Sequence, residues 1–477
     1  MEISCYGKCN KRTAIGNDAM AAGLDETSGP WYSGISRYQW LVLLIASLGW
    51  IFDVFEGQLF VVTSNRALAD LLGEQATRET IAYYNKLALA AFLVGGAVGG
   101  VGFGVLGDRI GRVKTMILTI LMYAGFTGLT AFAQSCWHLV ALRFLVATGV
   151  GGEWAVASAM VAEVFPKRAR AWSLGLFHAS SVLGIYVAVA VGTFIGANPS
   201  LGWRWCYAAG VLPALLTAWI YASLREPEAW LAARQAARQG AARPTGRILD
   251  LFAPEWRRGA WVGLALATIG LATFWGVYIE GWKLIREETE NRHLDPEVAL
   301  ARGPVRQKAL DQLPESVRKS IDRTEMLAMF LVVTGGGIGL VSFGPLANRL
   351  GRRGAFLLFC LGGMAAAVLM FQVLPHGPAW VRWTALPVFG YFATGMHAGY
   401  AIYFPELFPT RLRGTGSSFC FNGGRLLASP ILILTGWMQR DLAMSLTDSA
   451  TLLGLLFLLG IVVLAAAPET RGKELPA

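Results

Sequence analysis

Apolar runs of about 20 residues, separated by polar segments, recur along this chain from residue 38 to residue 467. An α-helix needs roughly 20 apolar residues to cross a bilayer. Because backbone polar groups must be paired inside lipid, such runs are predicted to be helical. We therefore expect an all-α integral membrane protein. Its twelve spans are expected at residues 38–62, 87–106, 115–132, 137–163, 172–194, 203–224, 260–282, 326–347, 355–374, 380–404, 415–437 and 450–467.

The polar segments predict how the spans are grouped. A polar N-terminal tail (1–37) precedes a first six-helix bundle (38–224), and an arginine-rich linker (225–258) separates it from a second bundle (259–467). The Ala, Arg and Gln residues of the linker predict short amphipathic helices along the inner membrane face. A short polar tail (468–477) follows the last span.

Two longer polar segments are expected outside the cell. The first is the loop 63–85. The second is a hydrophilic insertion, 283–325, whose nine cations balance nine acids. Such a neutral segment is compatible with translocation across the membrane, since the positive-inside rule, by which Lys and Arg stay in the cytoplasm, applies mainly to short loops. We expect one or two short helices in the insertion.

Composition agrees with a membrane protein and narrows its partners. The chain has 477 residues, of which 55% are hydrophobic and 15% charged, and its net charge is +10. Most cations lie in short loops between apolar runs, so membrane orientation explains them and we expect no nucleic-acid partner. The positive-inside rule predicts that both termini lie in the cytoplasm. We expect a monomer in the inner (plasma) membrane, with the lipid bilayer as its surroundings.

Several chemistries lack their sequence signals. The six cysteines do not have the spacing of a disulfide framework or a zinc site. The glycine-rich runs lack the lysine and serine of a phosphate-binding loop, and no nucleophile elbow or kinase motif is present. We therefore expect no metal, no cofactor and no enzymatic activity.

Two unrelated motifs each occur twice. Residues 104–114 read Gly-Val-Leu-Gly-Asp-Arg-Ile-Gly-Arg-Val-Lys, and residues 344–353 read Gly-Pro-Leu-Ala-Asn-Arg-Leu-Gly-Arg-Arg, which is a displacement of 240 residues. Residues 163–170 (Glu-Val-Phe-Pro-Lys-Arg-Ala-Arg) match residues 406–413 (Glu-Leu-Phe-Pro-Thr-Arg-Leu-Arg), displaced by 243. Nearly equal offsets imply a duplicated half, the expected build of transporters with parallel six-helix repeats.

These motifs resemble those of the major facilitator superfamily, in which the first motif joins the second and third helices. The resemblance covers Tyr38 to Leu475, and the tail at 468–472 (Pro-Glu-Thr-Arg-Gly) is similar to that of metabolite–proton symporters and sugar porters. It implies the twelve-helix major facilitator fold. Because Asn348 replaces the acid of the first loop copy, the second copy is expected to have a weaker gating role. Taken alone, the first loop could simply fix orientation. As gating residues the resemblance implies Gly104, Asp108, Arg109, Gly111, Arg112, Glu163, Arg170, Arg349, Arg352, Glu406 and Arg413.

Ionisable side chains inside spans are costly and usually functional, so they form the candidate site. Asp53 and Glu56 lie three residues apart and share one helix face. Two acids facing one cavity disfavour joint ionisation, so one of them can load and release a proton. The alternative is a structural pair neutralised by a nearby cation.

Two residues of the fourth span extend this proton-coupling set. Arg143 lies nearly level with Glu56 when depth is counted at 1.5 Å per residue. The sequence around Arg143 resembles the fourth helix of sugar porters and organic-acid symporters, in which an arginine pairs with a first-helix acid. Glu153 lies nearer the middle of the same span, in a frame similar to metabolite–proton symporters. Alternatively, Glu153 ties this helix to a neighbour.

Candidate substrate contacts lie in both halves. Arg425 is near the midplane of the eleventh span, where a guanidinium fits a substrate carboxylate; a fixed internal ion pair is the alternative. His178 and His397 are equally compatible with packing, and most tryptophans suit the core or the interface belt. The substrate-binding residues that we consider are Arg425, Asn422, His397, His178 and Trp154.

These features favour a secondary active transporter that carries a small organic anion with protons by alternating access. Its partners would be a small-molecule substrate and protons. A sugar or neutral-metabolite porter is the alternative. Hexose carriers usually have glutamines in the fifth and seventh spans, and neither span of this chain contains a glutamine, which disfavours a sugar substrate. A receptor that binds without transporting is disfavoured because it would not need Asp108, Arg112, Glu56 and Arg143.

Overall fold

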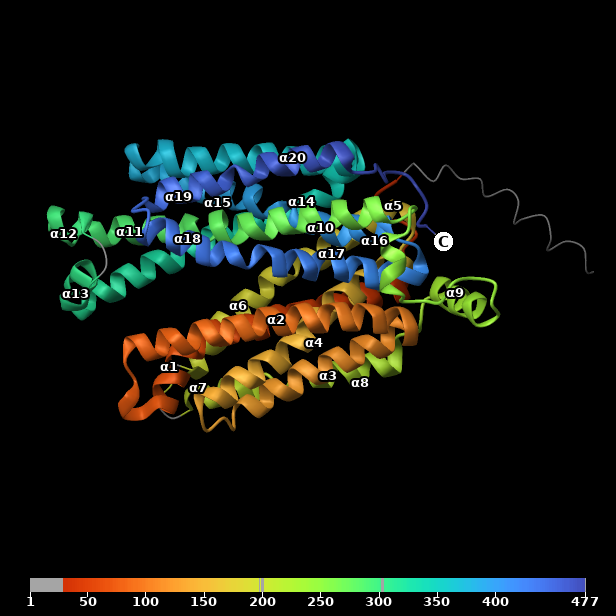
Figure 1. The fold of residues 1–477 in the computed structure, drawn as a ribbon, viewed down its shortest axis with the longest axis horizontal. Helices are drawn as coiled ribbons and strands as arrows, with labels where there is room; N and C mark the ends of the chain where they lie inside the picture. Colours follow the sequence, from red (N-terminus) through yellow and green to blue (C-terminus); the bar gives the residue numbers. More distant parts are fainter. Residues whose placement is uncertain (1–28, 197, 199–200, 302–303, 477) are drawn as a thin grey trace, which may run out of the picture.

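The computed structural model describes residues 29–196, 198, 201–301 and 304–476, and it arranges them as two helical halves lying side by side (Figure 1). The first half contains α1–α8 and the second α10–α20. Helix α9 lies beside the C-terminus at one end of the molecule, which we call the tail end. The opposite end carries α12 and α13, and we call it the insertion end.

The first half is built from long helices and from shorter ones that continue each other. Between α5 and α6 the chain bends at Ser180, and a π-helical turn follows α6. The helices are α1 (Arg37–Leu72), α2 (Arg78–Ile110), α3 (Arg112–Thr130), α4 (Cys136–Val164), α5 (Lys167–Ala179), α6 (Ser181–Val191), α7 (Gly202–Ala209) and α8 (Ala214–Ser223).

The linker and the second half follow the same plan. Pro430 separates α17 from α18, since proline has no N–H to continue the helix ladder. The helices are α9 (Glu228–Arg238), α10 (Arg257–Thr273), α11 (Glu280–Asn291), α12 (Pro296–Leu300), α13 (Pro304–Gln312), α14 (Glu315–Val368), α15 (Ala379–Gly395), α16 (His397–Leu407), α17 (Arg413–Ala428), α18 (Pro430–Arg440), α19 (Leu446–Gly454) and α20 (Leu456–Ala466).

The twelve predicted spans are all helical. Ten helical segments of the described chain are long and apolar enough to cross a membrane. One of them, 315–376, contains two predicted spans, because α14 continues through a turn at Gly351. The pair α15–α16 forms the remaining span and is interrupted at Met396. The predicted all-α, twelve-helix membrane fold is confirmed.

Several helices extend beyond the predicted spans at the insertion end. Helix α1 continues to Leu72, so much of the expected loop 63–85 is helical, and α11 and α14 extend well into the predicted insertion. Arg286 of α11 explains the latter extension, because it pairs with Asp322 (3.1 Å) and Glu325 of α14. The short helices α12 and α13 match the expectation for the remainder of the insertion.

The linker also contains an amphipathic helix, as expected. Trp230 is the buried residue of α9, whereas Leu231 and Arg238 are exposed. Of the expected N-terminal tail, residues 1–28 lie outside the described residues. Within the described part, Trp31 stacks on Trp172 of α5 with ring centroids 5.2 Å apart.

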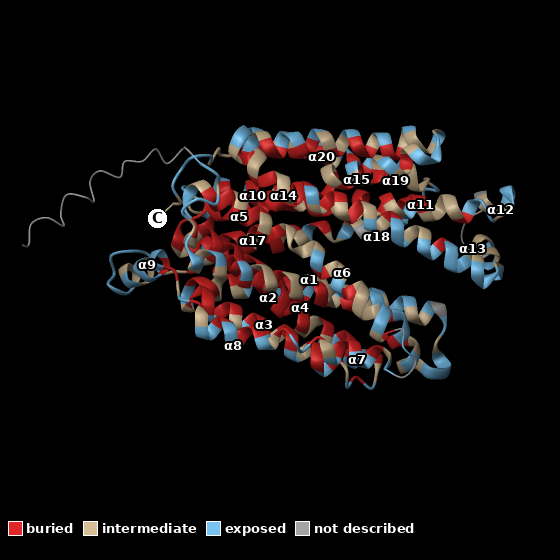
Figure 2. Ribbon diagram, turned by 180° about the vertical axis from the view of Figure 1, so that it is seen from behind, coloured by how far each residue is buried: buried red, intermediate tan, exposed pale blue. Residues whose placement is uncertain are grey.

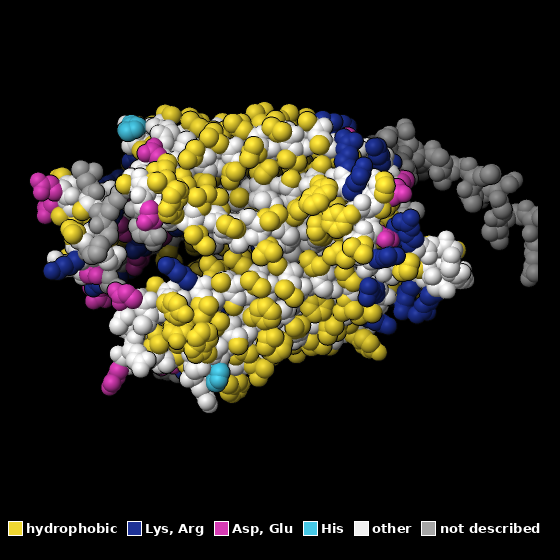
Figure 3. Space-filling model, viewed as in Figure 1, with side chains coloured by type: hydrophobic (Ala, Val, Ile, Leu, Met, Phe, Trp, Pro, Cys, Tyr) yellow, Lys and Arg dark blue, Asp and Glu magenta, His cyan; other side chains and the backbone are white. Residues whose placement is uncertain are grey.

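Burial and charge differ between the two ends of the molecule. Buried residues are densest toward the tail end, and the insertion end is more exposed (Figure 2). Hydrophobic side chains cover the flanks, Lys and Arg gather at the tail end, and a hollow separates the halves at the insertion end (Figure 3). The halves are therefore closed against each other at the tail end.

Candidate functional site

Asp108, at the end of α2, joins the first half to the second. Its carboxylate accepts hydrogen bonds from the backbone N–H of Gly414 (3.0 Å) and from the N–H (2.8 Å) and hydroxyl (2.6 Å) of Thr415. These N–H groups begin α17, where unpaired donors and the helix dipole favour an anion. Arg112 neutralises the fully buried carboxylate from one turn away, at 2.7 Å. Asp108 is therefore an interhelix cap between the halves.

Glu163 makes a second connection across the same interface. One carboxylate oxygen lies 2.9 Å from Arg112 Nη2 and 2.8 Å from Arg413 Nη1, and all three side chains are fully buried. Arg112 also donates to the carbonyl of Thr410 in the second half (3.0 Å). Removing Glu163 would leave two guanidiniums buried without their shared partner, which is strongly unfavourable.

The second copy of the motifs forms a similar cluster, whose ion pair joins two residues of the second half. Arg352 binds Glu406 through two nitrogens, at 2.7 and 3.0 Å. Asn348 accepts only a long bond from Arg352 (3.4 Å). Arg170, which matches Arg413 but lies in the first half, donates to the carbonyl of Ala162 in that same half (3.0 Å). The two copies are therefore related in sequence but unequal as links between the halves.

Glycines at equivalent positions explain why the first motif needs its spacing. Gly111 (φ +121°) and Gly351 (φ +83°) turn the chain in a backbone region that other residues rarely adopt. Gly104 packs so closely against Ser418 and Gly414 of α17 that a Cβ would not fit. Gly344 packs in the same way against Ala171 of α5. The expected residues Arg109 and Arg349 have exposed side chains.

Two further acids were not anticipated from the sequence. Glu226 accepts from the backbone N–H groups of Arg112 (2.6 Å) and Val113 (3.3 Å), and Glu469 accepts from those of Arg352 (3.0 Å) and Arg353 (3.1 Å). Each carboxylate thus caps the helix that follows a motif glycine.

The environment of Glu469 shows how such a cap is stabilised. Partial burial raises the pKa of Glu469, but the backbone hydrogen bonds outweigh burial and hold this pKa below its ordinary value. A signal for both caps was present in the sequence, since Glu226 and Glu469 are separated by 243 residues, the offset of the second repeated motif.

Trp230 is another contact that sequence reasoning missed. Its indole N–H donates to the backbone carbonyl of Asp108 at 2.8 Å, and its side chain is 1% exposed. The linker is held to the second half as well, because the N–H of Gly246 donates to the carbonyl of Arg411 (2.8 Å), whose guanidinium pairs with Asp250 (2.5 Å). The linker therefore contacts both halves at the closed end.

In the first half, Glu56 and Arg143 form the expected ion pair. Arg143 Nη1 lies 2.8 Å from Glu56 Oε1, and each side chain is 2% exposed. The guanidinium also lies over the rings of Phe60 and Phe92, at 4.5 and 4.2 Å from their centroids. The pair links α1 to α4 in a region from which water is largely excluded, where each partner is costly to leave alone.

Asp53 and Glu153 are the less completely paired acids. Asp53 Oδ1 is buried, and no described residue hydrogen-bonds to it. Glu153 accepts from the hydroxyl of Thr119 on α3 (2.5 Å), and its other oxygen lies against Gly49 of α1. Because Gly49 and Asp53 are one helical turn apart, the two carboxylates face the same region. The hydrogen bond to Thr119 also joins α4 to α3, which agrees with the alternative that Glu153 links its helix to a neighbour.

Arg425 brings a cation of the second half to this region. Its guanidinium lies 5.3 Å from the ring centroid of Phe421, and Asp53 is the acid that attracts it electrostatically. Nη1 is buried and has no hydrogen-bond partner among the described residues. A guanidinium nitrogen in this position can donate to a ligand carboxylate without first breaking a hydrogen bond.

Asn422, by contrast, is used to pack the halves together. Its amide donates to the carbonyl of Gly151 on α4 (3.1 Å), and it lies so close to Gly100 of α2 that a Cβ there would not fit. The neighbouring Ser418 donates to the carbonyl of Gly100. A substrate contact by Asn422 would therefore require the halves to separate.

Trp154 and the two histidines occupy buried positions. Trp154 of α4 stacks on Phe421 of α17 with centroids 4.1 Å apart, and its indole donates to Nδ1 of His178 (3.0 Å). The carbonyl of His178 accepts from Trp50 (3.1 Å). His397 Nδ1 lies 2.8 Å from the carbonyl of Thr394. In this arrangement Trp154 bridges the halves and both histidines are buried, with Nε2 of His397 lacking a hydrogen-bond partner among the described residues.

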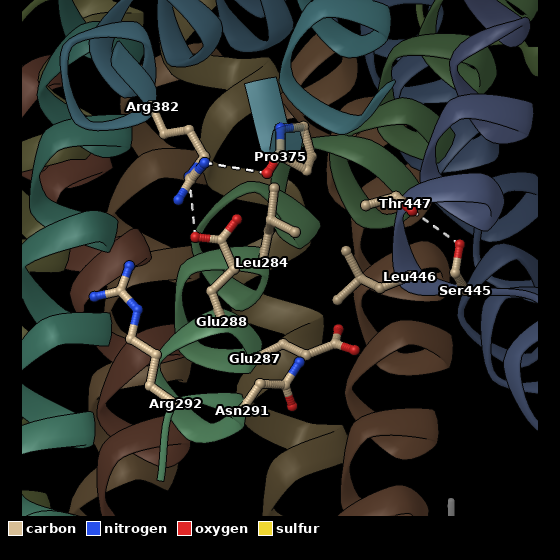
Figure 4. Close-up of a pocket in the computed structure, with 10 residues that line it drawn as sticks. All are labelled: Leu284, Glu287, Glu288, Asn291, Arg292, Pro375, Arg382, Ser445, Leu446 and Thr447. Carbon is tan, nitrogen blue, oxygen red and sulfur yellow. Dashed lines mark hydrogen bonds and ion pairs between the residues drawn. The ribbon is translucent and has the colours of Figure 1, made fainter. Parts of the chain in front are cut away.

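A separate cavity of about 320 Å³ lies at the insertion end of the second half (Figure 4). Arg382 projects into it, pairs with Glu288 (3.0 Å) and donates to the carbonyl of Pro375 (3.2 Å). Ser445 and Thr447 line the other side. None of the predicted site residues lines this cavity, so it is distinct from the charged region between the halves.

Comparisons with known proteins agree with this architecture. The model of the Major Facilitator Superfamily matches residues 40–432. The chain is 26% identical to a probable 4-methylmuconolactone transporter of Cupriavidus pinatubonensis, over 93% of each chain. It is also 26% identical to a cis,cis-muconate transport protein of Acinetobacter baylyi, over 71% of this chain and 74% of the relative.

A solved structure extends the comparison to the fold. A proton:xylose symporter bound to 6-bromo-6-deoxy-D-glucose superposes with a TM-score of 0.64 and 18% sequence identity. The match covers 92% of this chain and 98% of that protein. At this identity the likeness shows a shared fold.

Proposed function

The chain belongs to the Major Facilitator Superfamily of membrane transporters, and we propose that it carries a small organic anion together with protons by alternating access. The proposal rests on an excess of acidic over basic side chains in the buried region near the contact between the halves. Three buried or largely buried carboxylates (Asp53, Glu56 and Glu153) face two guanidiniums (Arg143 and Arg425). An uncompensated carboxylate is expensive in such a place, so a proton is the least costly way to neutralise it.

An anionic substrate makes this argument stronger. Its carboxylate would engage the unpartnered Nη1 of Arg425 and withdraw that cation from Asp53. The acids would then have less compensation, and they would take up protons as the substrate binds. Proton binding and anion binding therefore favour each other at this site, which is the requirement for symport.

The Glu56–Arg143 pair supplies a link to conformational change. An ionised Glu56 holds Arg143 and joins α1 to α4, whereas a protonated Glu56 would release the guanidinium to its aromatic neighbours. Protonation would thereby free these two helices to move relative to each other. Gating would depend on the Asp108 and Glu163 connections, which must break for the tail end to open.

We propose that the tail end faces the cytoplasm. Lys and Arg gather there (Figure 3), as the positive-inside rule requires. The site is then closed toward the cytoplasm and reached from outside through the hollow at the insertion end. Both ends of the chain would be cytoplasmic, and the membrane would be the inner (plasma) membrane. The names of the two relatives, which concern muconate and a muconolactone, support organic acids as the substrate class.

Two variants in proteoliposomes test the assigned roles, with cis,cis-muconate included in a panel of mono- and dicarboxylates. Glu56→Gln should retain substrate exchange and lose at least tenfold of the accumulation driven by a pH gradient. Arg425→Lys should weaken substrate binding about tenfold or more, because an ammonium cannot replace the planar fork.

Matched controls are Glu474→Gln and Arg243→Lys, whose side chains are exposed at the tail end. Both should behave as wild type. If Glu56→Gln accumulates substrate with the pH dependence of wild type, the proton site is elsewhere and Asp53 is the next candidate. If Arg425→Lys binds as wild type, Arg425 is not the substrate anchor.

A further inference from the structure

A groove at the tail end is lined by four arginines. It has a volume of about 590 Å³ and lies between the end of α2, the last turns of α9 and the linker segment after it. Arg109 comes from α2, Arg234 and Arg238 from α9, and Arg247 from the linker. No acidic side chain lines it within the described chain. So many guanidiniums around one groove repel each other unless an anion is present.

Nearby carboxylates are engaged elsewhere. Asp250 lies 3.8 Å from Arg247 but only 2.5 Å from Arg411, which is the closer and more buried partner. Glu226 is used to cap the start of α3. The groove therefore keeps an uncompensated positive charge that the local acids do not remove.

The register of α9 directs its arginines into the groove. Trp230, Arg234 and Arg238 are spaced at four-residue intervals, so they share one helix face. The buried Trp230 fixes that face against Asp108, and the Arg234 guanidinium lies over the indole at 5.0 Å from its centroid. Arg234 is thus held in position by packing, and Arg238 follows one turn further along.

We propose that this groove binds a phosphate-bearing anion, either a lipid headgroup or a soluble phosphate compound. A phosphate group offers several acceptor oxygens and more than one negative charge, which suits converging guanidiniums better than a single carboxylate does. Arg109 ends a membrane span, so the groove lies at the level where a headgroup and a dissolved anion can both reach it.

Occupation of the groove has a structural consequence for the gate. The anion would bridge α9 and the linker to the end of α2, next to the carbonyl of Asp108 that Trp230 holds. It would therefore stabilise the closed tail end. This site is separate from the transported substrate, and its binding can be measured without transport.

Binding of radiolabelled inorganic pyrophosphate to the purified full-length protein in neutral detergent tests the first source. In the second arm, the protein is placed in phosphatidylcholine nanodiscs with or without phosphatidylglycerol, and retained phosphatidylglycerol is counted by native mass spectrometry. The test variant is Arg234→Gln/Arg238→Gln. The matched control, Arg243→Gln/Lys473→Gln, removes two exposed tail-end cations that do not line the groove.

We expect wild type and the control to bind at least one probe with affinities within twofold of each other, and the test variant to bind it at least tenfold more weakly. Binding of pyrophosphate alone assigns a soluble anion, binding of phosphatidylglycerol alone assigns a headgroup, and binding of both shows that the groove accepts either. The proposal is overturned if wild type binds neither probe, if the test variant binds as wild type does, or if the control loses as much.

Discussion

Asp108 shows how one side chain can hold two halves of a transporter together. Its carboxylate lies at the end of α2 and accepts three hydrogen bonds from the start of α17 in the other half. Arg112 compensates the buried charge from the same loop. The neutral counterpart, Asn348, accepts a single long bond from within its own half. The negative charge of Asp108 is therefore what makes the first motif the stronger connection.

Replacing Asp108 by Asn should weaken closure at the tail end. The side chain keeps its size but loses the charge that strengthens its hydrogen bonds, at a cost of about 2 kcal/mol. We expect a shift of about 30-fold in the balance between the two transport states, and reduced uptake by folded protein. Uptake kinetics at matched expression measure the effect.

Asn348→Ala is the matched control for that substitution and should leave uptake close to wild type. The gating role of Asp108 would be refuted by uptake kinetics in Asp108→Asn that equal those of wild type. It would also be refuted if Asn348→Ala reduced uptake to the same extent.

Some residue contacts could be predicted from the sequence, and others could not. The Glu56–Arg143 pair was accessible because the family resemblance pairs a fourth-helix arginine with a first-helix acid, and helical rise places the two side chains at nearly the same depth. The contact of Asn422 with Gly151 was not, because it depends on which helix of the other half faces α17. Helical spacing gives the depth and face of a residue, but it does not identify the neighbouring helix.

At the scale of the helices, hydropathy located the spans but not the ends of the helices. An apolar run marks only the part of a helix that lies in lipid, whereas α1, α11 and α14 continue beyond it. The pairs of Arg286 with Asp322 and Glu325 join segments more than 30 residues apart, and no local pattern announces them. Hydrogen bonding between Asn65 and Asn85 (2.8 Å) joins α1 and α2 in the same way.

The proposed orientation predicts which elements can be labelled from outside the cell. Ser316 is exposed in the first turn of α14 at the insertion end. In a background with Cys5 and Cys9 replaced by Ser, Ser316→Cys should react with an impermeant maleimide in intact cells. Lys473→Cys, at the tail end, is the matched control and should react only after lysis. The opposite pattern would invert the topology.

At the scale of the molecule, the two halves are related in sequence but perform different tasks. Offsets of 240 and 243 residues relate the loop motifs, the Glu–Arg clusters and the caps Glu226 and Glu469. Asp53 and Glu153, each with one buried oxygen that has no partner among the described residues, lie in the first half, as does the pair Glu56–Arg143, whereas Arg425 comes from the second. In our account, protons are handled mainly by one half and the substrate anion is held by the other, so transport needs both.

This division has an energetic basis. Drawing an anion into a negative cell costs about 2.3 kcal/mol per charge for each 100 mV, and the protons that we propose to be co-transported would offset that cost. Sequence alone supplied the candidate acids and arginines. Their imbalance became apparent only when the structure showed which of them share hydrogen bonds, as Glu56 does with Arg143.

Proton movement that accompanies substrate entry tests this account most directly. The purified protein is reconstituted in liposomes that contain the pH indicator pyranine, with equal pH on both sides. Radiolabelled cis,cis-muconate, or the best-transported carboxylate of the panel, is then added outside, and protein-free liposomes correct for passive entry. We predict that the interior acidifies in proportion to the substrate taken up. Entry of the substrate at constant interior pH would contradict proton-coupled anion symport.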